Sequence, residues 1–293
     1  MLLRALVSQL TEQFAQAGIE APNVEAEVLI AEVLGINRGQ LGAQIITEGV
    51  AEPQQLETIL AFADRRAARE PLQHLTGRAY FRNLELSVGK GVFIPRPETE
   101  LLAQLGIDAL RAATETTVKA GERPLGIDLG TGSGAIALAL ATEVPGATIH
   151  AVEYSDEAYP WTTKNFEKYR ATGADANLRQ GDLRVAFAEF DGLVDVVVTN
   201  PPYIPVDMVP IYPEVALHDP ALALYGGEDG LDLVRAASKT GLRLLKPGGF
   251  FAVEHADIQG PSVVELLRSD GWLQVQQHQD FNQRDRVVSA VRP

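Results

Sequence analysis

The first 75 residues have an apolar pattern with a helical period. Apolar side chains recur at three- and four-residue steps at Leu2, Leu3, Leu6, Val7, Leu10 and Phe14. Such spacing is typical of an amphipathic helix. We expect a second helix over Val24–Leu34 with Asn23 as its N-cap, and a third that begins at Glu52-Pro53 and is stopped by Pro71. Because no strand pattern occurs here, residues 1–75 are predicted to form a small helical domain.

The stretch 76–92 has a different pattern. Two short strand-like pieces, Ala79–Phe81 and Leu84–Val88, flank the pair Arg82-Asn83. Short strand-like runs around a polar pair indicate a hairpin. We therefore expect a β-hairpin linker between the helical domain and the rest of the chain.

From Phe93 to the end of the chain, helical and β patterns alternate. The strand candidates are Leu125–Leu129, Ala147–Glu153, Asn177–Asp182, Val194–Thr199, Gly249–Glu254, Leu273–Gln277 and Arg286–Val291. Helical stretches separate the first five candidates, whereas a short connection joins the last two. Alternation of this kind predicts an α/β fold with a doubly wound, mostly parallel seven-stranded sheet over residues 93–293, closed by a hairpin at one edge.

Composition and charge narrow the classes of function. The chain has 293 residues, no cysteine and a formal net charge of −14. Proteins that hold nucleic acid by its phosphates carry a basic face, so this charge argues against nucleic acid as the main substrate. The lack of cysteine excludes disulfides and thiolate catalysis. Since neither a membrane-spanning apolar run nor a signal-peptide pattern is present, we expect a cytoplasmic protein, and nothing in the sequence requires more than a monomer.

A glycine-rich turn lies between the strand candidate Leu125–Leu129 and a helix. It consists of Gly130, Thr131, Gly132, Ser133 and Gly134. Glycines in such a turn tolerate positive φ and let a ligand approach the backbone closely. The spacing G-x-G-x-G differs from the G-x-G-x-x-G turn of nicotinamide-binding proteins, although a nicotinamide cofactor remains an alternative at this point.

Acidic residues stand at the ends of the next two strand candidates. Glu153 lies 25 residues after Asp128, close to the spacing of about 20 residues that is typical of a ribose-binding carboxylate. Its two oxygens suit the two hydroxyls of a ribose. Asp182 is placed to accept a hydrogen bond from the exocyclic amine of an adenine, with Leu183 against the ring. The three strand ends together predict a site for a nucleoside-containing cofactor.

The segment Asn200-Pro201-Pro202-Tyr203 follows the apolar strand candidate Val194–Thr199. Asn200 is thus expected at the carboxyl end of a parallel strand, where open α/β sheets bind their ligands. The prolines stiffen the turn and leave carbonyl groups free to accept hydrogen bonds. An Asn200 oxygen, the Pro201 carbonyl and the Tyr203 ring suit a planar –NH2 group; the alternative is an ordinary proline turn with a capping asparagine.

These motifs together resemble the HemK-type release factor glutamine methyltransferases, which are class I S-adenosylmethionine-dependent methyltransferases. The resemblance spans nearly the full length of the chain. Besides the two turns above, it includes residues 71–77, 93–100, 213–215, 218–220, 225–230 and 284–287. The tetrapeptide Asn-Pro-Pro-Tyr also occurs in adenine N6-methyltransferases. Its combination with Phe93-Ile94-Pro95-Arg96-Pro97-Glu98-Thr99-Glu100 is far more specific.

The resemblance implies a role for each candidate site residue. The methionine part of S-adenosylmethionine would be lined by Gly130, Thr131, Gly132, Ser133 and Gly134. Its ribose would be held by Glu153, and its adenine flanked by Asp182 and Leu183. Some relatives have an aromatic residue in place of Leu183, so stacking on the adenine is expected to be weaker here. The cofactor site would be closed from the linker side by Phe93, Pro95 and Glu98. The catalytic segment would be Asn200, Pro201, Pro202 and Tyr203, with Asn200 also close to the cofactor.

The resemblance also implies a reaction and a partner. A methyl group would pass from S-adenosylmethionine to the side-chain amide nitrogen (N5) of the glutamine in the Gly-Gly-Gln motif of peptide chain release factors, the proteins of translation termination. Residues 1–75 would form a substrate-recognition domain. The long irregular loop 204–230 is typical of a lid or a partner-binding surface.

Two other functions remain open. An adenine N6-methyltransferase acting on DNA or RNA would use the same tetrapeptide on a base flipped out of its duplex, but the net charge argues against it. A binding protein that has lost catalysis is the second alternative. The histidines show no metal-ligand spacing, so no metal site is predicted. His255, which follows Glu254 at a strand end, is expected to be structural.

Overall fold

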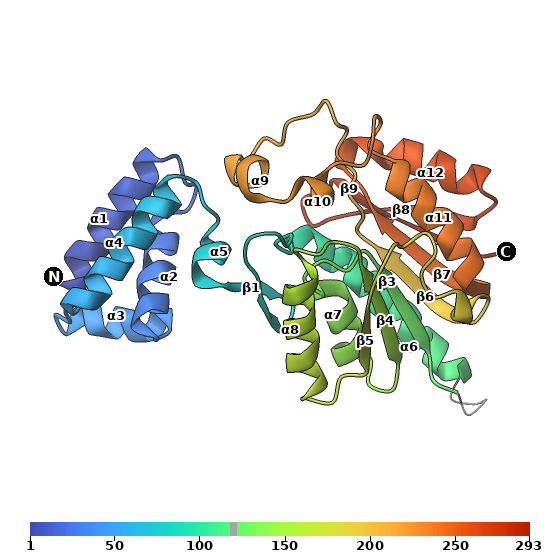
Figure 1. The fold of residues 1–293 in the computed structure, drawn as a ribbon, viewed down its shortest axis with the longest axis horizontal. Coiled ribbons are helices and arrows are strands. Elements are labelled where there is room, and N and C mark those ends of the chain that lie inside the picture. Colours follow the sequence, from blue (N-terminus) through green and yellow to red (C-terminus); the bar gives the residue numbers. More distant parts are fainter. Residues whose placement is uncertain (118–121) are drawn as a thin grey trace. The chain divides into compact units, whose positions relative to one another are not determined.

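The computed structural model describes residues 1–117 and 122–293, which divide into two compact units (Figure 1). The first unit contains Met1–Arg78 together with Pro210–His218. The second contains Ala79–Val209 and Asp219–Pro293. No helix among the described residues combines the length and apolar character needed to cross a membrane.

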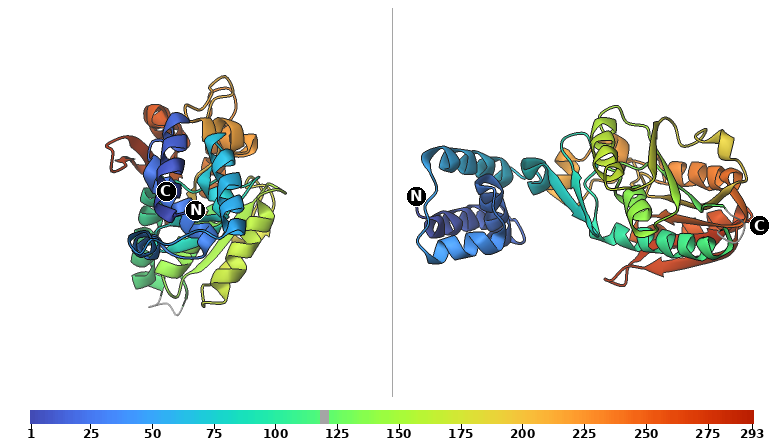
Figure 2. Two further views of the ribbon diagram at one scale, coloured as in Figure 1. Left: turned by 90° about the vertical axis from the view of Figure 1, so that its left-hand side faces the viewer. Right: turned by 90° about the horizontal axis from the view of Figure 1, so that it is seen from below.

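The first unit is helical. Its helices are α1 (Leu3–Gln16), α2 (Pro22–Leu34), α3 (Arg38–Ile46), α4 (Pro53–Ala67), α5 (Leu72–Thr76) and α9 (Pro213–His218). The blue helices of Figure 2 pack side by side, and Leu6, Leu10 and Phe14 of α1 are fully buried among Leu29, Ile30 and Ile59. Apolar residues at helical spacing thus form the core of a small bundle.

The start of α2 differs from the expected one. Pro22 is the first residue of the helix and Ala21 occupies the N-cap, whereas the Asn23 side chain donates a hydrogen bond to Glu27 at 3.1 Å. A proline at the first helical position is favourable because its missing N–H would have no partner there. Asn23 therefore lies inside the first turn, and the prediction that it caps the helix was wrong.

Helix α9 joins the first unit through ion pairs. Glu214 accepts hydrogen bonds from Arg66 at 2.9 Å and from Arg69 at 2.7 Å. Arg66 is buried and also pairs with Glu25 of α2. The buried guanidinium is thus balanced by two carboxylates, as a charge in a protein interior requires.

The second unit contains a two-stranded sheet of β1 (Arg78–Phe81) and β2 (Leu84–Ser87) and a seven-stranded sheet. The strands of the large sheet are β3 (Leu125–Leu129), β4 (Thr148–Glu153), β5 (Ala176–Gln180), β6 (Val194–Thr199), β7 (Leu245–Glu254), β8 (Leu273–Gln279) and β9 (Asp285–Val291). Their order is β5-β4-β3-β6-β7-β9-β8. The pairs from β5 to β7 are parallel, and β9 runs antiparallel to β7 and β8. The predicted doubly wound, mostly parallel sheet is confirmed.

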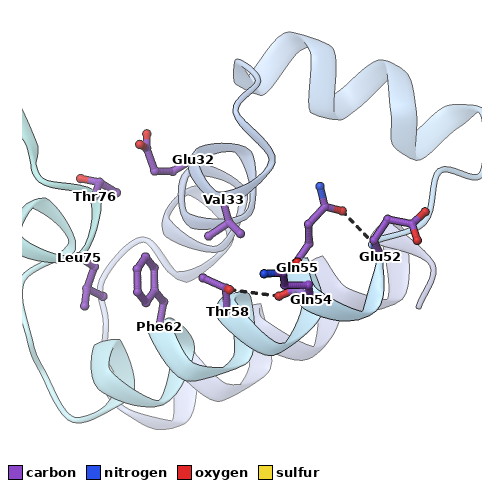
Figure 3. Close-up of a pocket in the computed structure, with 9 residues that line it drawn as sticks. All are labelled: Glu32, Val33, Glu52, Gln54, Gln55, Thr58, Phe62, Leu75 and Thr76. Atoms are coloured by element: carbon purple, nitrogen blue, oxygen red, sulfur yellow. Dashed lines mark hydrogen bonds between the residues drawn. The ribbon is translucent and has the colours of Figure 1, made fainter.

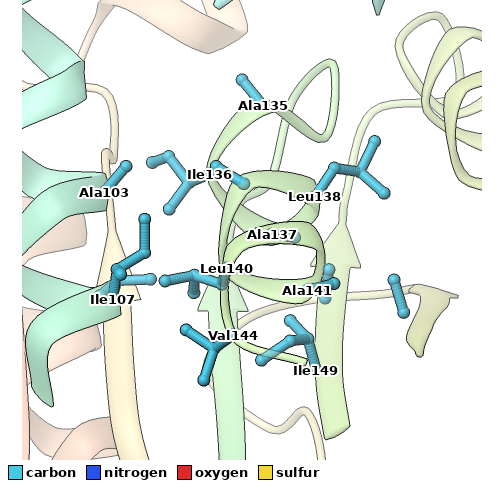
Figure 4. Packing of buried hydrophobic residues seen from close by; sticks show 14 of the residues in the cluster. Ala103, Ile107, Ala135, Ile136, Ala137, Leu138, Leu140, Ala141, Val144 and Ile149 are labelled. Carbon is cyan, nitrogen blue, oxygen red and sulfur yellow. The ribbon is translucent and has the colours of Figure 1, made fainter. Parts of the chain in front are cut away.

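Helices cover both faces of this sheet. The apolar core of one face includes residues of α6 (Glu100–Thr117), α7 (Ala135–Glu143) and α8 (Tyr159–Arg170), and that of the other face includes residues of α11 (Asp232–Leu244) and α12 (Gly260–Ser269). Figure 4 shows Ile107 of α6 and Leu140 of α7 side by side in the first of these cores. Gly106 allows this close approach, because a Cβ there would lie 3.0 Å from both Leu140 and Val198.

One connection is shorter than expected. Between β5 and β6 the only helical element is the 3-10 helix η3 (Ala188–Phe190). Leu183, Phe187 and Phe190 recur at helical spacing in this stretch, but Phe187 has a positive φ of 59°, which does not fit a continuous α-helix. The chain therefore crosses as a turn-rich segment. The predicted alternation of strand and helix therefore fails at this one crossover.

The order of the strands places the candidate site. The chain proceeds from β3 outward through β4 and β5, then returns to the other side of β3 with β6 and β7. The sheet therefore has its switch point between β3 and β6, and ligands of doubly wound sheets bind at the carboxyl ends of strands around such a point. The glycine-rich turn ends β3, Glu153 ends β4 and Asn200 follows β6.

Candidate active site

The glycine-rich turn after β3 has an open backbone. Gly130, Gly132 and Gly134 all have positive φ, at 75°, 57° and 89°. A Cβ added to Gly130 or Gly132 would meet nothing within 4 Å, whereas one on Gly134 would lie 2.8 Å from Phe166. Gly134 is thus required by helix packing. Gly130 and Gly132 instead leave free space beside their backbone, which fits a ligand bound against this turn.

Two side chains of helix α8 hydrogen bond to the backbone of the turn. Thr162 donates a hydrogen bond to the Gly132 carbonyl at 2.5 Å, and Asn165 donates to the Ser133 carbonyl at 2.9 Å. Both side chains are fully buried. Neither residue could be identified from the sequence, because a lone threonine or asparagine within a helix carries no signal of its partner.

Asp128 lies beneath the turn at the end of β3 and is fully buried. Its Oδ2 accepts hydrogen bonds from the Thr131 hydroxyl at 2.6 Å and from the Ala137 N–H at 3.1 Å. Its Oδ1 has no partner in the described chain. Burial raises the pKa of this carboxyl to about 7, with a smaller contribution from the charge of Glu153. Asp128 thus connects β3, the turn and the start of α7, a role that the sequence analysis missed.

Glu153 stands at the end of β4 and faces the same turn. Its Oε2 accepts a hydrogen bond from the Gly132 N–H at 2.8 Å, and its Oε1 accepts from the Ser155 N–H at 2.7 Å. The residue is 7% exposed, and burial raises the pKa of its carboxyl. Two oriented backbone donors hold the carboxylate in one position, as a ligand-binding carboxylate requires.

Asp182 and Leu183 follow β5. Asp182 is partly exposed and pairs with its neighbour Arg184, whose Nη1 lies 2.9 Å from Oδ2. Leu183 is buried in the apolar core that also contains Val152 of β4. Any ligand hydrogen bond to Asp182 therefore competes with Arg184.

The Asn200 side chain lies between β6 and the segment before α6. Its Nδ2 donates a hydrogen bond to the Thr99 hydroxyl at 3.3 Å. Thr99 ends the 3-10 helix η1 (Pro97–Thr99) and is buried. Within the described chain the Pro201 carbonyl accepts no hydrogen bond. The Asn200 Oδ1 and the Pro201 carbonyl oxygen thus both remain available as acceptors.

Tyr203 closes the segment. Its hydroxyl donates to Oε1 of Glu254, the last residue of β7, at 3.4 Å. Burial of the hydroxyl raises the pKa of Tyr203, and the nearby carboxyl of Glu254 raises it further. The phenol is therefore neutral and acts as a hydrogen-bond donor.

The loop 226–230 clamps the backbone of this segment. Gln259 donates its amide to the Tyr203 carbonyl at 2.8 Å and to the Asp229 carbonyl at 3.2 Å. A Cβ on Gly226 would lie 2.4 Å from the Pro202 carbonyl oxygen, and one on Gly230 would lie 2.2 Å from the Tyr203 carbonyl oxygen. Only glycine allows this contact, so the loop fixes the tetrapeptide by direct backbone packing.

The residues between the hairpin linker and α6 are arranged around Arg96. Its guanidinium lies over the Phe93 ring at 5.0 Å from the centroid and donates to Asp219 at 2.6 Å. Pro95 and Glu98 are partly exposed next to it in the chain. Because the Asp219 side chain is 1% exposed, the ion pair anchors the middle of the loop 204–230 to the segment before α6. The contact of Phe93, Pro95 and Glu98 with a cofactor stays a prediction.

Two family models match the chain. Residues 5–77 match the PrmC N-terminal domain, and residues 107–207 match the methyltransferase small domain. A release factor glutamine methyltransferase of Streptomyces coelicolor is 48% identical over 291 residues, which cover 99% of this chain and 98% of that protein. The chain belongs to the family of release factor glutamine methyltransferases.

Two further proteins are similar to this chain at lower sequence identity. The 4-amino-L-phenylalanine/4-methylamino-L-phenylalanine methyltransferase of Streptomyces pristinaespiralis is 37% identical over 99% of this chain and 95% of its own length. The catalytic domain of hMettl16, solved in complex with a MAT2A 3′UTR hairpin, has a TM-score of 0.53 at 16% identity and covers 70% of this chain and 75% of that chain. That likeness concerns the fold alone.

His255 is not one of the residues of the candidate site. His255 is buried, with Nδ1 2.7 Å from the Ala256 carbonyl and Nε2 3.0 Å from the Gln277 amide. Burial lowers its pKa, which fits a neutral structural histidine. The described residues contain no group of three His, Cys, Asp or Glu side chains arranged to hold a metal ion.

A surface hollow of about 610 Å³ lies in the first unit (Figure 3). It is lined by Glu32, Val33, Glu52, Gln54, Gln55, Thr58, Phe62, Leu75 and Thr76. Its lining includes none of the residues that form the candidate site, so it carries no part of the chemistry described above.

Proposed function

We propose that this protein transfers a methyl group from S-adenosylmethionine to the side-chain amide nitrogen (N5) of the glutamine in the Gly-Gly-Gln motif of peptide chain release factors. The proposal rests on the hydrogen bonding of the Asn200 side chain. Its Nδ2 is used by Thr99, so its Oδ1 and the neighbouring Pro201 carbonyl remain for the two hydrogens of a planar –NH2 group.

The cofactor would be held by residues at the ends of three strands. S-adenosylmethionine supplies a methyl group on a positively charged sulfur. The turn 130–134 would line its methionine part, Glu153 its ribose, and Asp182 with Leu183 its adenine. Phe93, Pro95 and Glu98 would close the site. The free space beside Gly130 and Gly132 and the fixed carboxylate of Glu153 support this assignment.

The catalytic segment acts by positioning. An amide nitrogen is a poor nucleophile because its lone pair is delocalised into the carbonyl group. Asn200 Oδ1 and the Pro201 carbonyl accept the two amide hydrogens, fix the amide plane and raise the electron density on nitrogen. Pro202 stiffens the turn, and Tyr203 packs over the amide. Orientation and electrostatic stabilisation then supply most of the rate, without a strong base. The bond from sulfur to the methyl group breaks as the bond to nitrogen forms, and the nitrogen loses one proton after the transfer.

The acceptor is a protein rather than a small molecule. The loop that follows Tyr203 exposes a run of apolar side chains at Val206, Met208, Val209, Ile211, Tyr212 and Leu217. Contiguous exposed apolar residues are typical of a protein-binding surface. This loop and the helical residues 1–75 would recognise the body of the release factor while the Gly-Gly-Gln loop enters the site.

Mass spectrometry of a purified release factor incubated with this protein and S-adenosylmethionine tests the proposal. We expect one added methyl group on the glutamine of the Gly-Gly-Gln motif, and no addition when that glutamine is replaced by asparagine. An unmodified release factor would contradict the proposal.

One relative supports a second candidate acceptor. The Streptomyces pristinaespiralis enzyme is named for an aromatic amine, 4-amino-L-phenylalanine. It matches 99% of the present chain. An aromatic amine is also a planar –NH2 group, so 4-amino-L-phenylalanine and adenine-containing DNA and RNA belong in the same assay. If the amino acid or the nucleic acid is methylated and the release factor is not, the proposed substrate is wrong.

A further inference from the structure

Glu254 occupies the strand end next to Asn200. Strand β7 pairs in parallel with β6, and Val253 is opposite Thr199 in the register. Glu254 and Asn200 therefore follow paired residues at the same edge of the sheet. Glu254 is 1% exposed. A carboxylate at this depth is costly unless its oxygens are paired, so its presence beside the catalytic segment requires an explanation.

A hydrogen bond joins Glu254 to that segment. Its Oε1 accepts a hydrogen bond from the Tyr203 hydroxyl at 3.4 Å. The Thr99 side chain also lies near the carboxyl and lowers its pKa. No hydrogen bond of ordinary length joins the two side chains, and Oε2 is buried without a partner in the described chain. The same Thr99 hydroxyl accepts from Asn200.

These contacts have a fixed direction. An ionised carboxylate only accepts hydrogen bonds, so the negative charge of Glu254 attracts the single proton of the nearby Thr99 hydroxyl. The Thr99 oxygen then has only lone pairs left for Asn200. A lone pair binds the NH2 group of an amide and repels its oxygen. The order Asn200 to Thr99 to Glu254 thus selects one of the two flips of the Asn200 amide.

We propose that Glu254 and Thr99 are positioning residues that hold the Asn200 amide with Oδ1 toward the acceptor nitrogen. Glu254 also orients Tyr203 through its hydroxyl, so one buried carboxylate sets both ends of the tetrapeptide. The inference rests on the proposed function, since the acceptor –NH2 group belongs to the substrate. Neither residue touches the reacting atoms.

Charged groups on several elements face Glu254. Arg286 of β9 favours the ionised carboxylate, whereas Glu98 of η1 disfavours it. Arg96 and Glu98 also act on Tyr203, and the neutral His255 follows on the same strand. Burial outweighs the favourable contacts and raises the pKa of Glu254 to about 7. A protonated Glu254 donates as well as accepts, so the direction of the Thr99 hydroxyl is lost as the pH falls below this value.

Steady-state kinetics of four variants test the proposal. In Glu254→Gln and Thr99→Val we expect kcat to fall by at least about 10-fold, while KM and the Kd of S-adenosylmethionine change less than about threefold. Thr99→Ser keeps the hydroxyl and should stay within about threefold of the wild type. The double variant Thr99→Val with Glu254→Gln should be no slower than the slower single variant, because both changes break one chain of contacts. Glu265→Gln, an exposed residue of α12, is the matched control.

A spectroscopic measurement tests the orientation without turnover. The side-chain NH2 signals of Asn200 are assigned by their loss in Asn200→Asp. In the wild type we expect these signals to shift with an apparent pKa near 7, and in Glu254→Gln we expect no such titration. The wild-type kcat should rise over the same pH range and the kcat of Glu254→Gln should not.

The outcomes separate this inference from the proposed function. Wild-type protein that methylates no release factor contradicts the proposed function, whatever the NH2 signals of Asn200 show. An active wild type together with normal kcat in Thr99→Val, or equal losses in Thr99→Val and Thr99→Ser, overturns the positioning role. If Glu254→Gln does not fold, the two Thr99 variants carry the test alone.

Discussion

The Glu153 carboxylate accepts a hydrogen bond from the Gly132 N–H at 2.8 Å. The residue that ends β4 therefore also holds the turn that ends β3, and the two proposed halves of the cofactor site are one connected structure. Because the opposite oxygen of Glu153 is held by the Ser155 N–H, the carboxylate is already in position before a ligand arrives.

Replacement of Glu153 should weaken cofactor binding before it affects turnover. In Glu153→Ala we expect the Kd of S-adenosylmethionine to rise about 10- to 100-fold, because hydrogen bonds to a charged group contribute about 1.5–3 kcal/mol. Glu153→Gln should have a similar effect, since its NH2 group faces the Gly132 N–H or the Ser155 N–H. Calorimetry gives the Kd, with Glu167→Gln on the exposed face of α8 as control. Unchanged binding in both Glu153 variants would refute the ribose role.

Asn200→Asp should produce the opposite pattern. The substitution keeps the size of the side chain but puts a negative charge where Nδ2 now donates to Thr99. We expect kcat to fall by about 100-fold or more, the scale of losing one preorganised catalytic hydrogen-bonding group, while the Kd of S-adenosylmethionine changes little. Asn282→Asp in an exposed turn is the control. Near-normal turnover in Asn200→Asp would contradict the acceptor role of the amide.

Gly230→Ala tests the backbone clamp on the tetrapeptide. Gly230 and Gly173 both have positive φ, at 77° and 97°, but only Gly230 is crowded, with a Cβ position 2.2 Å from the Tyr203 carbonyl oxygen. Gly173→Ala should cost about 1–2 kcal/mol of unfolding free energy from backbone strain and leave kcat unchanged. Gly230→Ala should add about 1–3 kcal/mol from overpacking and lower kcat. Urea unfolding followed by the fluorescence of Trp161 and Trp272, both in the second unit, measures the difference.

Asp128 should make stability depend on pH. Its pKa of about 7 in the folded state is above the ordinary value near 4 in the unfolded chain. The folded state therefore binds an extra proton between these values, and the contribution to stability is present below about pH 4 and is lost as the pH rises to 7. Replacing the carboxyl by an amide removes this dependence.

The unfolding free energy of the wild type minus that of Asp128→Asn measures this contribution. We expect it to fall by about 3 kcal/mol between pH 4 and pH 8, a shift of roughly three pKa units being worth at most about 4 kcal/mol. Taking the difference cancels the carboxyls whose pKa values are lowered by arginine partners, such as Glu143 and Glu214. A difference that stays constant over this range would show that folding does not raise the pKa of Asp128.

Periodicity was sufficient for most of the fold. The β-branched run Val194–Thr199 is fully buried as β6, and the helical spacing of Leu6, Leu10 and Phe14 forms the core of the first unit. Both follow from the local pattern of apolar and polar residues, which depends only on neighbours in the chain. The missing helix before β6 and the displaced cap of α2 were decided by short segments in which several local structures compete.

The candidate site divides in the same way. Strand-end positions identify Glu153 and Asn200, because parallel strands bring their carboxyl ends to one edge of the sheet. The side chains that hold Asn200, Ser133 and Tyr203 are 101, 32 and 56 residues away in the chain, and they are Thr99, Asn165 and Gln259. Single polar residues carry no sequence signal of such distant contacts. The sequence by itself therefore determined the strands, the turns and the chemistry at their ends, whereas only the tertiary structure decided which buried groups orient them.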